Sequence, residues 1–233
     1  MKAKTLLSEI LEDSRSYEVS YTDFFLLFMR AYGYLHNESL MLHRDVVDNI
    51  TAKIKKLAKI IAKLPDTLNI LKSHVLRLSN QGLQPFLVDC LGLPEIYEIY
   101  RQVVKRCGIL SVVVELYVNT KALTYRFRGV FEEPSMVEVA KLLGTSLYKH
   151  IDTVVHHELG KPVESYTLVK LAETRFKIFV DELARDAINK RYAFIVADHG
   201  YDIYCENHRY YLGHGRDAKF AKIAPLIIVN CNV

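Results

Sequence analysis

The sequence predicts an α/β protein with a mostly parallel sheet flanked by helices, preceded by an all-helical N-terminal region. Apolar side chains recur at helical spacing over residues 1–80, without a strand pattern. After this region, short apolar or β-branched runs alternate with longer helical patterns. Such alternation is typical of βαβ units, whose right-handed crossovers leave neighbouring strands parallel. We therefore divide the chain into a helical region, 1–80, and an α/β domain, 81–233.

Four helices are expected in the helical region. The first contains the apolar side chains of residues 6–11, and the second follows Thr22 and Asp23, which are expected to form its N-cap. The third covers 48–64 and ends at a proline, after which a fourth helix reaches about Leu78.

The third helix is amphipathic. Its isoleucine and leucine side chains share one face, and lysines cover the other. A lysine-rich face is typical of a solvated helix surface, and contact with phosphate or nucleic acid is the alternative interpretation. The lysines are Lys53, Lys55, Lys56, Lys59 and Lys63.

The α/β domain contains five expected strands and three expected helices. The strands are 85–88, 109–118, 146–151, 192–197 and 225–229. The helices are 93–106, 134–143 and 165–190.

Composition excludes several classes of protein. Half of the residues are hydrophobic and a quarter are charged, which is ordinary for a folded chain and excludes a disordered or collagen-like one. No run of eighteen apolar residues is present, so the sequence predicts no transmembrane helix. The net charge of +4 is too small to predict nucleic-acid binding by itself.

The N-terminal charges and the cysteine spacing favour a cytoplasmic protein. Glu9, Glu12 and Asp13 lie where a secretory signal peptide would need an apolar stretch. The cysteines are scattered without CxxC spacing, which predicts buried thiols in a reducing compartment rather than a disulfide framework or a zinc knuckle. They are Cys90, Cys107, Cys205 and Cys231.

Aspartates and histidines follow several of the predicted strands. Ligands of an open α/β sheet gather beyond the carboxyl ends of its strands, where a carboxylate is held in place and still accessible. Three aspartates and three histidines at such ends would suit a pair of divalent cations, with zinc the most natural choice and manganese the second. The six residues are Asp89, Asp152, His156, Asp198, His199 and His214.

Each of these residues also has a purely structural explanation. Asp89 would form a turn, and Asp152 would be a helix N-cap with His156 on a solvated face. The pair of Asp198 and His199 would form a turn at a strand end. These explanations would all have to hold independently, which favours the metal site.

The order and spacing of these residues resemble the alkaline phosphatase superfamily, and within it the chain is most similar to the PglZ-like phosphohydrolase and phosphodiesterase branch. The resemblance covers about 85–233, although Cys90 stands where a small Gly or Ala is usual. The motifs that carry it are Asp152-x-x-x-His156, Asp198-His199-Gly200 and Gly213-His214-Gly215, followed by the last strand.

The resemblance implies two metal sites. One would be held by Asp89, Asp198 and His199, together with the nucleophile. The other would be held by Asp152, His156 and His214. His157 is the alternative to His156 as the metal ligand, because a shift of one residue at the start of a helix would exchange their positions.

The resemblance also implies a serine or threonine nucleophile, which lies after the second strand and often begins a helix. Coordination to a divalent cation would deprotonate its hydroxyl. Thr124 is the first choice, Thr120 the second and Ser135 the third. Four cations are candidates for binding phosphoryl oxygens, with ordinary surface charge as the alternative. They are Arg126, Arg128, Arg216 and Lys219.

The implied function is a two-metal-dependent phosphoric ester hydrolase, either a phosphodiesterase or nuclease or a phosphatase, with a covalent phospho-enzyme intermediate. A nucleotide or oligonucleotide ester is slightly favoured as the substrate, because the PglZ-like branch includes nucleases. A homo-oligomer is compatible with the sequence. Two alternatives stay open. The first is a non-catalytic metal- or nucleic-acid-binding interaction protein on a reduced phosphatase fold. The second is a phosphomutase, although the interval 135–152 leaves no room for the cap domain that a phosphomutase usually has.

Overall fold

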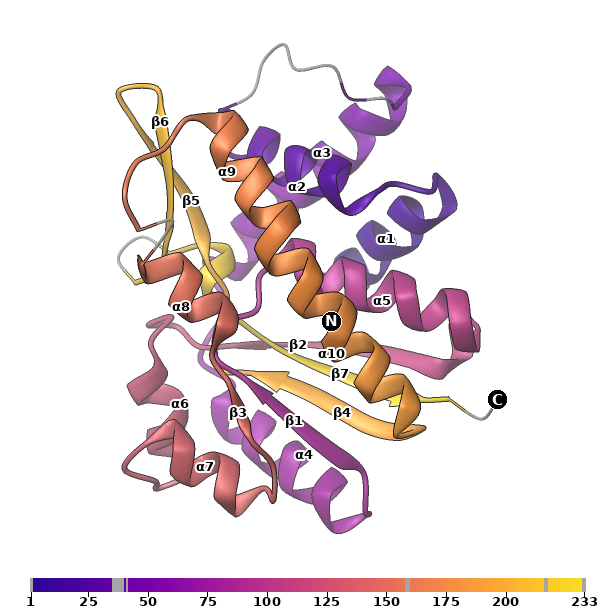
Figure 1. Ribbon diagram of the computed structural model, residues 1–233, viewed down its shortest axis with the longest axis vertical. Coiled ribbons are helices and arrows are strands. Elements are labelled where there is room, and N and C mark those ends of the chain that lie inside the picture. The colour runs from indigo at the N-terminus through magenta and orange to yellow at the C-terminus, as the bar shows by residue number, and fades with distance from the viewer. Residues whose placement is uncertain (1, 35–39, 41, 158–159, 216–217, 232–233) are drawn as a thin grey trace.

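The structure is a computed structural model that describes residues 2–34, 40, 42–157, 160–215 and 218–231 (Figure 1). A five-stranded sheet crosses the molecule with helices on both of its faces, and a separate two-stranded hairpin lies beside the helix α8. None of the helices in the described residues is long and apolar enough to cross a membrane.

Four of the helices in the described residues precede the first strand, and the remaining six lie between β1 and β4. They are α1 (Lys2–Ser16), α2 (Tyr21–Ala31), α3 (Arg44–Ile61), α4 (Leu68–Asn80), α5 (Leu93–Cys107), α6 (Thr124–Val130), α7 (Met136–Leu142), α8 (His150–His157), α9 (Ser165–Leu171) and α10 (Lys177–Asn189). Short turns of 3-10 helix cover Ile109–Ser111 and Phe220–Lys222.

The strand order in the sheet is β2-β7-β4-β1-β3, and β5 pairs with β6 in the hairpin. The strands are β1 (Gln84–Val88), β2 (Val112–Val118), β3 (Leu147–Tyr148), β4 (Tyr192–Ala197), β5 (Asp202–Glu206), β6 (Arg209–Gly213) and β7 (Ile223–Asn230).

The sheet is mixed, so the prediction of a mostly parallel sheet is not confirmed. β1 pairs in parallel with β3 and β4, whereas β7 is antiparallel to both of its neighbours, β4 and β2. Two antiparallel pairings in a row return β2 to the direction of β4. The strands β1, β2, β3 and β4 therefore all end at the same edge, which we call the carboxyl edge.

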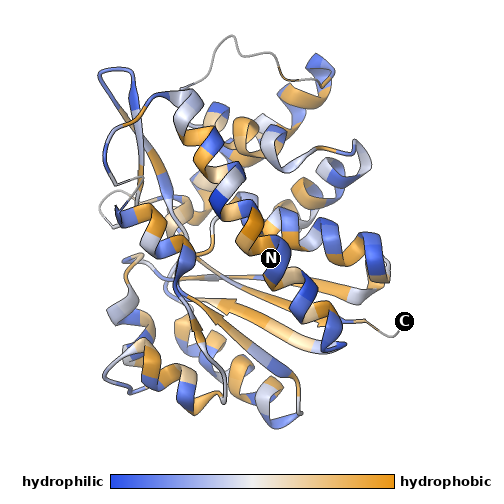
Figure 2. Ribbon diagram, in the orientation of Figure 1, coloured by the Kyte–Doolittle hydropathy of each residue, from blue (hydrophilic) through white to orange (hydrophobic). Residues whose placement is uncertain are grey.

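Helices cover both faces of the five-stranded sheet, so side chains on both sides of its central strands are buried and apolar. In β4, Ala193 and Ile195 pack into the larger core with α1, α2, α3, α5, α9 and α10, and Phe194 and Val196 pack into a second core with α4, α6 and α7. The central strands β4 and β7 are accordingly mostly apolar, whereas the outer faces of the helices carry polar residues (Figure 2).

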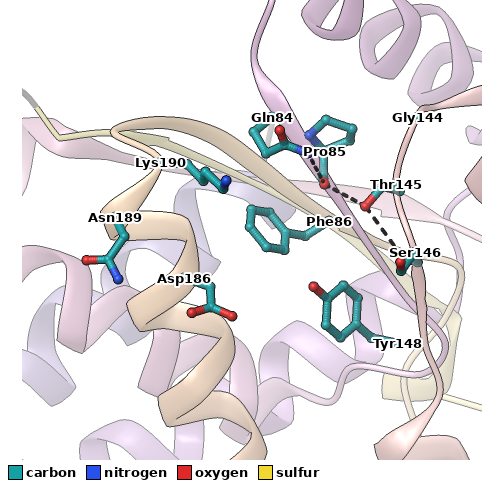
Figure 3. A pocket seen from close by; sticks show the side chains of 10 residues that line it. All are labelled: Gln84, Pro85, Phe86, Gly144, Thr145, Ser146, Tyr148, Asp186, Asn189 and Lys190. Atoms are coloured by element: carbon teal, nitrogen blue, oxygen red, sulfur yellow. Dashed lines mark hydrogen bonds between the residues drawn. The ribbon is translucent and has the colours of Figure 1, made fainter.

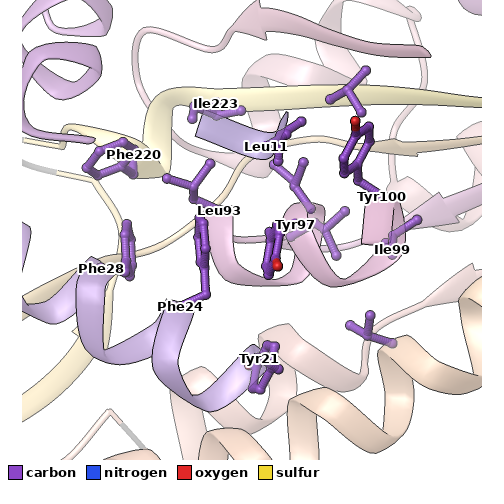
Figure 4. Packing of buried hydrophobic residues seen from close by; sticks show 14 of the residues in the cluster. Leu11, Tyr21, Phe24, Phe28, Leu93, Tyr97, Ile99, Tyr100, Phe220 and Ile223 are labelled. Carbon is purple, nitrogen blue, oxygen red and sulfur yellow. The ribbon is translucent and has the colours of Figure 1, made fainter. Parts of the chain in front are cut away.

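The helical region and the sheet share the larger core. Phe24 of α2 stacks on Tyr97 of α5 with ring centroids 4.3 Å apart, and Phe28 packs edge-on against Phe220 (Figure 4). A buried carboxyl group joins the same elements, because Glu95 of α5 accepts hydrogen bonds from Tyr21 at 2.6 Å and Tyr201 at 2.9 Å. The division of the chain at residue 80 stays a prediction.

Several local predictions are corrected. The expected strand 146–151 is wrong beyond residue 148, because α8 begins at His150. The helix expected over 165–190 contains a π-helical segment at Ala172–Phe176, and α6 and the hairpin were not predicted. The N-cap of α2 is Ser20, whose hydroxyl oxygen accepts the N–H of Asp23 at 3.0 Å.

Two of the four cysteines form a disulfide bond, which corrects the prediction of free thiols for this pair. Cys107 ends α5 and Cys231 follows β7, and their Cα atoms lie 5.3 Å apart. The helix and the strand bring together residues that are 124 positions apart in the chain, so the spacing of the cysteines carries no signal of the pairing. Cys90 and Cys205 are free.

Candidate metal centre

The first group of polar side chains lies where β1 and β4 end side by side. The parallel register pairs Val88 with Ala197, so the residues that follow, Asp89 and Asp198, are placed next to each other. One potential ligand atom from each of Asp89, Asp198 and His199 lies within 4.8 Å of the others, and all three residues are buried. This is the first of the two predicted ligand sets.

The second group contains Asp152, His156 and His214, whose potential ligand atoms also lie within 4.8 Å of one another. Asp152 is in the first turn of α8 rather than at a strand end, which corrects its predicted surroundings. His156 follows four residues later on the same helix face, with its Nε2 3.2 Å from Asp152 Oδ1. His214 follows β6, and its Nε2 lies 2.8 Å from His156 Nε2. His157 is exposed and is not part of this group.

The two groups are neighbours. The rings of His199 and His214, one from each group, have centroids 4.2 Å apart and planes inclined at 37°. Asp89, Asp198 and His199 are buried, whereas half of the His156 side chain is exposed. Solvent therefore reaches the pair of groups from the side of His156.

Backbone carbonyls fix the orientation of two of the histidines. His199 Nδ1 lies 2.9 Å from the Gly200 carbonyl oxygen, and His214 Nδ1 lies 3.0 Å from that of Ala122. A carbonyl oxygen only accepts hydrogen bonds, so each Nδ1 carries the proton. In the neutral rings, each Nε2 then presents a lone pair, as in histidines that bind metals. The lone pair of His199 faces Asp198 Oδ2, and that of His214 faces His156 Nε2.

The first group has an excess of hydrogen-bond acceptors. Asp198 Oδ1 accepts the N–H of Cys90 at 3.1 Å, but Asp198 Oδ2 and Asp89 Oδ1 are buried and have no hydrogen-bond partner among the described residues. Asp198 Oδ2 lies 3.3 Å from the Nε2 of His199. Two lone pairs facing each other at this distance are unfavourable unless a cation or a proton lies between them.

Burial and like charge shift two pKa values in the centre. Burial raises the pKa of the Asp89 carboxyl group to about 7, with further contributions from the negative charges of Asp198 and Asp152. Burial lowers the pKa of His214 to about 4, assisted by the charges of His199 and His156. His214 is consequently neutral at pH 7, the form in which imidazole binds a metal.

Of the three candidate nucleophiles, Thr124 lies at the first group. It is the first residue of α6, and its Oγ1 is 3.3 Å from His199 Nε2, to which the hydroxyl can donate. Thr120 instead donates its hydroxyl to Asp66 Oδ2 at 3.1 Å. Ser135 is the N-cap of α7, where its hydroxyl oxygen accepts the N–H of Glu138.

The candidate phosphate-binding cations are dispersed. Arg128 lies one helical turn after Thr124 in α6, whereas Arg126 faces Asp66, with Nη2 3.8 Å from Oδ2. Lys219 places its ammonium group 5.3 Å above the ring of Tyr32, and Arg216 lies outside the described residues.

Asn119 was not among the predicted site residues. It is fully buried directly after β2, and its Nδ2 donates to the carbonyl oxygens of Leu123 at 3.0 Å and Asp198 at 3.1 Å. This amide joins the segment before Thr124 to the segment that carries Asp198 and His199. The signal was present, because Asn119 follows a predicted strand in the same way as Asp89.

A pocket of about 750 Å³ lies at the opposite end of β1 from Asp89 (Figure 3). Gln84, Phe86, Tyr148 and Lys190 are among the side chains that line it, and none of the six predicted ligands does. Pocket size therefore does not identify the metal centre, which is defined by its donor atoms.

No protein-family model, curated protein or solved structure matches the chain. The chemistry of the centre therefore has to be inferred from its own residues.

We predict that Asp89→Asn stabilises the metal-free protein at alkaline pH. A carboxyl group whose pKa is raised on folding keeps its proton in the folded chain after the unfolded chain has lost it. Its contribution to the free energy of unfolding therefore falls as pH rises from about 4 to about 7. Asparagine carries no charge at any pH and so avoids this loss of stability. The free energy of unfolding of the variant should exceed that of the wild type by roughly 2 to 4 kcal/mol at pH 8, and the two should be nearly equal at pH 4.

Urea unfolding of the chelator-treated protein at both pH values measures this difference. Asp186→Asn removes an exposed carboxylate and serves as the control, with the same small effect at either pH. An Asp89→Asn effect that does not change between pH 4 and pH 8 would contradict the raised pKa of the buried Asp89 carboxyl group.

Proposed function

We propose that the protein is a two-metal-dependent phosphoric ester hydrolase with Thr124 as the nucleophile. The observation that carries this proposal is the meeting of three features at the carboxyl edge. Two groups of aspartate and histidine side chains lie side by side, each offering oxygen and nitrogen donors. A threonine hydroxyl lies 3.3 Å from Nε2 of His199 in the first group. The resemblance in motif order to the PglZ-like branch supports the same reaction class.

The residues fit divalent cations. Asp89, Asp198 and His199 would hold one cation next to Thr124, and Asp152, His156 and His214 would hold the other. The unpartnered carboxylate oxygens of Asp89 and Asp198 and the Nε2 lone pair of His199 are the donors that such an ion needs. A set of imidazoles and carboxylates suits Zn²⁺ first and Mn²⁺ second. Bound cations would supply positive charge that lowers the pKa of the threonine hydroxyl and neutralises phosphoryl oxygens.

The reaction would proceed in two displacements at phosphorus. Thr124 loses its hydroxyl proton to solvent, and its Oγ forms a bond to phosphorus while the bond from phosphorus to the leaving oxygen breaks. The leaving group departs with that electron pair and takes a proton from water. A water molecule then attacks phosphorus, the bond to Oγ breaks and Thr124 regains a proton. One ester and one water are thereby converted into one alcohol and one phosphate.

The burial of the centre suits this reaction. Asp198 and His199 are fully buried, so they keep water away from the inner side of Thr124. The substrate would enter from the solvent side, past His156. Lys149, directly before α8, is close enough for its charge to lower the pKa of Asp89, and it is an additional candidate for contact with a phosphoryl oxygen.

We predict that Thr124→Ala reduces hydrolysis of bis-p-nitrophenyl phosphate with Zn²⁺ or Mn²⁺ by at least about a thousandfold, because the bond-forming oxygen is lost. Thr120→Ala is the matched control, since its hydroxyl is engaged by Asp66, and its rate should stay within about threefold of wild type. Release of p-nitrophenolate measures both.

Full activity of Thr124→Ala would move the nucleophile to another residue. If the protein binds two metals but hydrolyses neither phosphate diesters nor monoesters, the interaction-protein alternative replaces the enzyme. Transfer of the phosphoryl group back to its alcohol instead of to water would favour the phosphomutase.

Asn119 is assigned as a positioning residue in the same proposal. Its amide holds the Leu123 carbonyl and the Asp198 carbonyl at a fixed separation, and Thr124 and His199 are the next residues along each segment. It does not contact the Thr124 hydroxyl itself, so it would act through the backbone.

Asn119→Leu keeps the side-chain size and removes both hydrogen bonds. We expect kcat to fall by about ten- to a hundredfold through misplacement of Thr124, with KM and metal content close to wild type. Asn69→Leu, on the exposed face of α4, is the control. Unchanged kcat in Asn119→Leu, or equal losses of kcat and of bound metal, would contradict a positioning role.

A further inference from the structure

A groove with an apolar floor and a lysine rim lies between the end of α2, the second half of α3 and the turn before β7. Its volume is about 290 Å³. The floor is formed mainly by Ala31, Ala58, Ala62 and Phe220. Lys55, Lys59 and Lys219 stand at its rim, and we call this feature the lysine groove.

The lysines of the groove form no ion pair with a carboxylate of the described residues. Residues 51–65 contain five lysines and no aspartate or glutamate. Lys53 is paired with Asp13 at 2.7 Å, but Lys55 and Lys59 are exposed and have no ion-pair partner among the described residues. The ammonium group of Lys219 lies over the Tyr32 ring, and no carboxylate within the described part of the chain is paired with it. The rim is therefore complementary to more than one negative charge.

The floor restricts the kind of anion that fits. A free phosphate ion would use the lysines but leave the accessible apolar surface of Ala31, Tyr32 and Ala62 in contact with water. A chain of phosphates joined by sugars and carrying planar bases offers both a repeating negative charge and apolar surface. The combination of floor and rim favours single-stranded nucleic acid over a small anion.

A single turn of chain separates the lysine groove from the metal centre. Lys219 and Phe220 line the groove, whereas Ala218 and Ala221 of the same turn pack against Ala122, whose carbonyl oxygen holds His214. This wall is held rigidly, because the buried carboxylate of Asp202 accepts the backbone N–H groups of residues 219, 220 and 221. An extended ligand at the metal centre would have the groove on the other side of this turn.

We propose that the lysine groove binds a single-stranded oligonucleotide beside the phosphodiester that is cleaved at the metal centre. The binding site stands on the groove itself, and only its relation to a cleaved bond rests on the proposed function. In this arrangement Lys219, Lys55 and Lys59 bind the substrate away from the reacting phosphorus.

Binding is measured by the fluorescence anisotropy of a labelled twelve-nucleotide single-stranded DNA, using the full chain with chelator present so that no cleavage occurs. Lys55→Glu/Lys59→Glu should weaken binding by about tenfold or more and lower the slope of log K against log salt by about 1.4, since two phosphate contacts are lost. The matched control Lys105→Glu/Lys190→Glu removes the same charge from exposed lysines that lie outside the groove, and its affinity should stay within about twofold.

Three results would overturn the proposal: no binding of the oligonucleotide by wild-type protein, equal losses in the two double variants, or binding to vesicles of anionic phospholipid in place of the oligonucleotide. Circular dichroism of each variant confirms that it is folded. Oligonucleotide binding is measured without metal, and hydrolysis of bis-p-nitrophenyl phosphate is measured without oligonucleotide. The two assays therefore distinguish a groove that does not bind nucleic acid from a metal centre that does not hydrolyse phosphate esters.

Discussion

The parallel pairing of β1 with β4 is the constraint on which the candidate centre depends. It sets Val88 beside Ala197 and so forces Asp89 and Asp198 together at a buried strand edge, where each keeps a carboxylate oxygen without a hydrogen-bond partner among the described residues. Two unpaired carboxylates in a buried site are unfavourable unless a proton or a cation compensates them. The raised pKa of Asp89 means that a proton compensates the charge in the absence of metal, and a bound divalent cation would compensate it instead. The orientation of His199, with its proton directed to a backbone carbonyl, adds another acceptor to the same place and increases the need for a cation.

The helical N-terminal region supports this edge. Tyr21 and Tyr32, at the two ends of α2, donate to the buried carboxyl groups of Glu95 and Asp202. Glu95 in turn holds Tyr201, two residues after His199, and Asp202 holds the turn that separates the centre from the lysine groove. The helices before residue 80 are thus part of the framework that fixes the position of His199, and one of them, α3, supplies two of the three lysines of the groove, Lys55 and Lys59. The two parts of the chain would then share both the support of the centre and the binding of its ligand.

The residues of the centre were more predictable than the elements that carry them. Asp89 and Asp198 follow apolar strands whose ends are clear in the sequence, and Asn119 follows a strand in the same way, so a rule that includes amides as well as carboxylates predicts all three. The predicted strand before Asp152 is wrong beyond residue 148, because the run 147–151 is too short for its period to separate strand from helix. The spacing of four residues nevertheless places Asp152 and His156 on one face of α8. The antiparallel direction of β7 and the bond between Cys107 and Cys231 depend on contacts between distant segments, which local patterns do not record.

The most direct measurement is anomalous diffraction at the zinc edge from crystals of the protein grown with Zn²⁺. Two metal sites predict two peaks about 3.5 to 4 Å apart, one among Asp89, Asp198 and His199 and the other among Asp152, His156 and His214. Zinc bound only at surface histidines such as His157, with no peak at either group, would contradict the metal centre and with it the proposed hydrolysis.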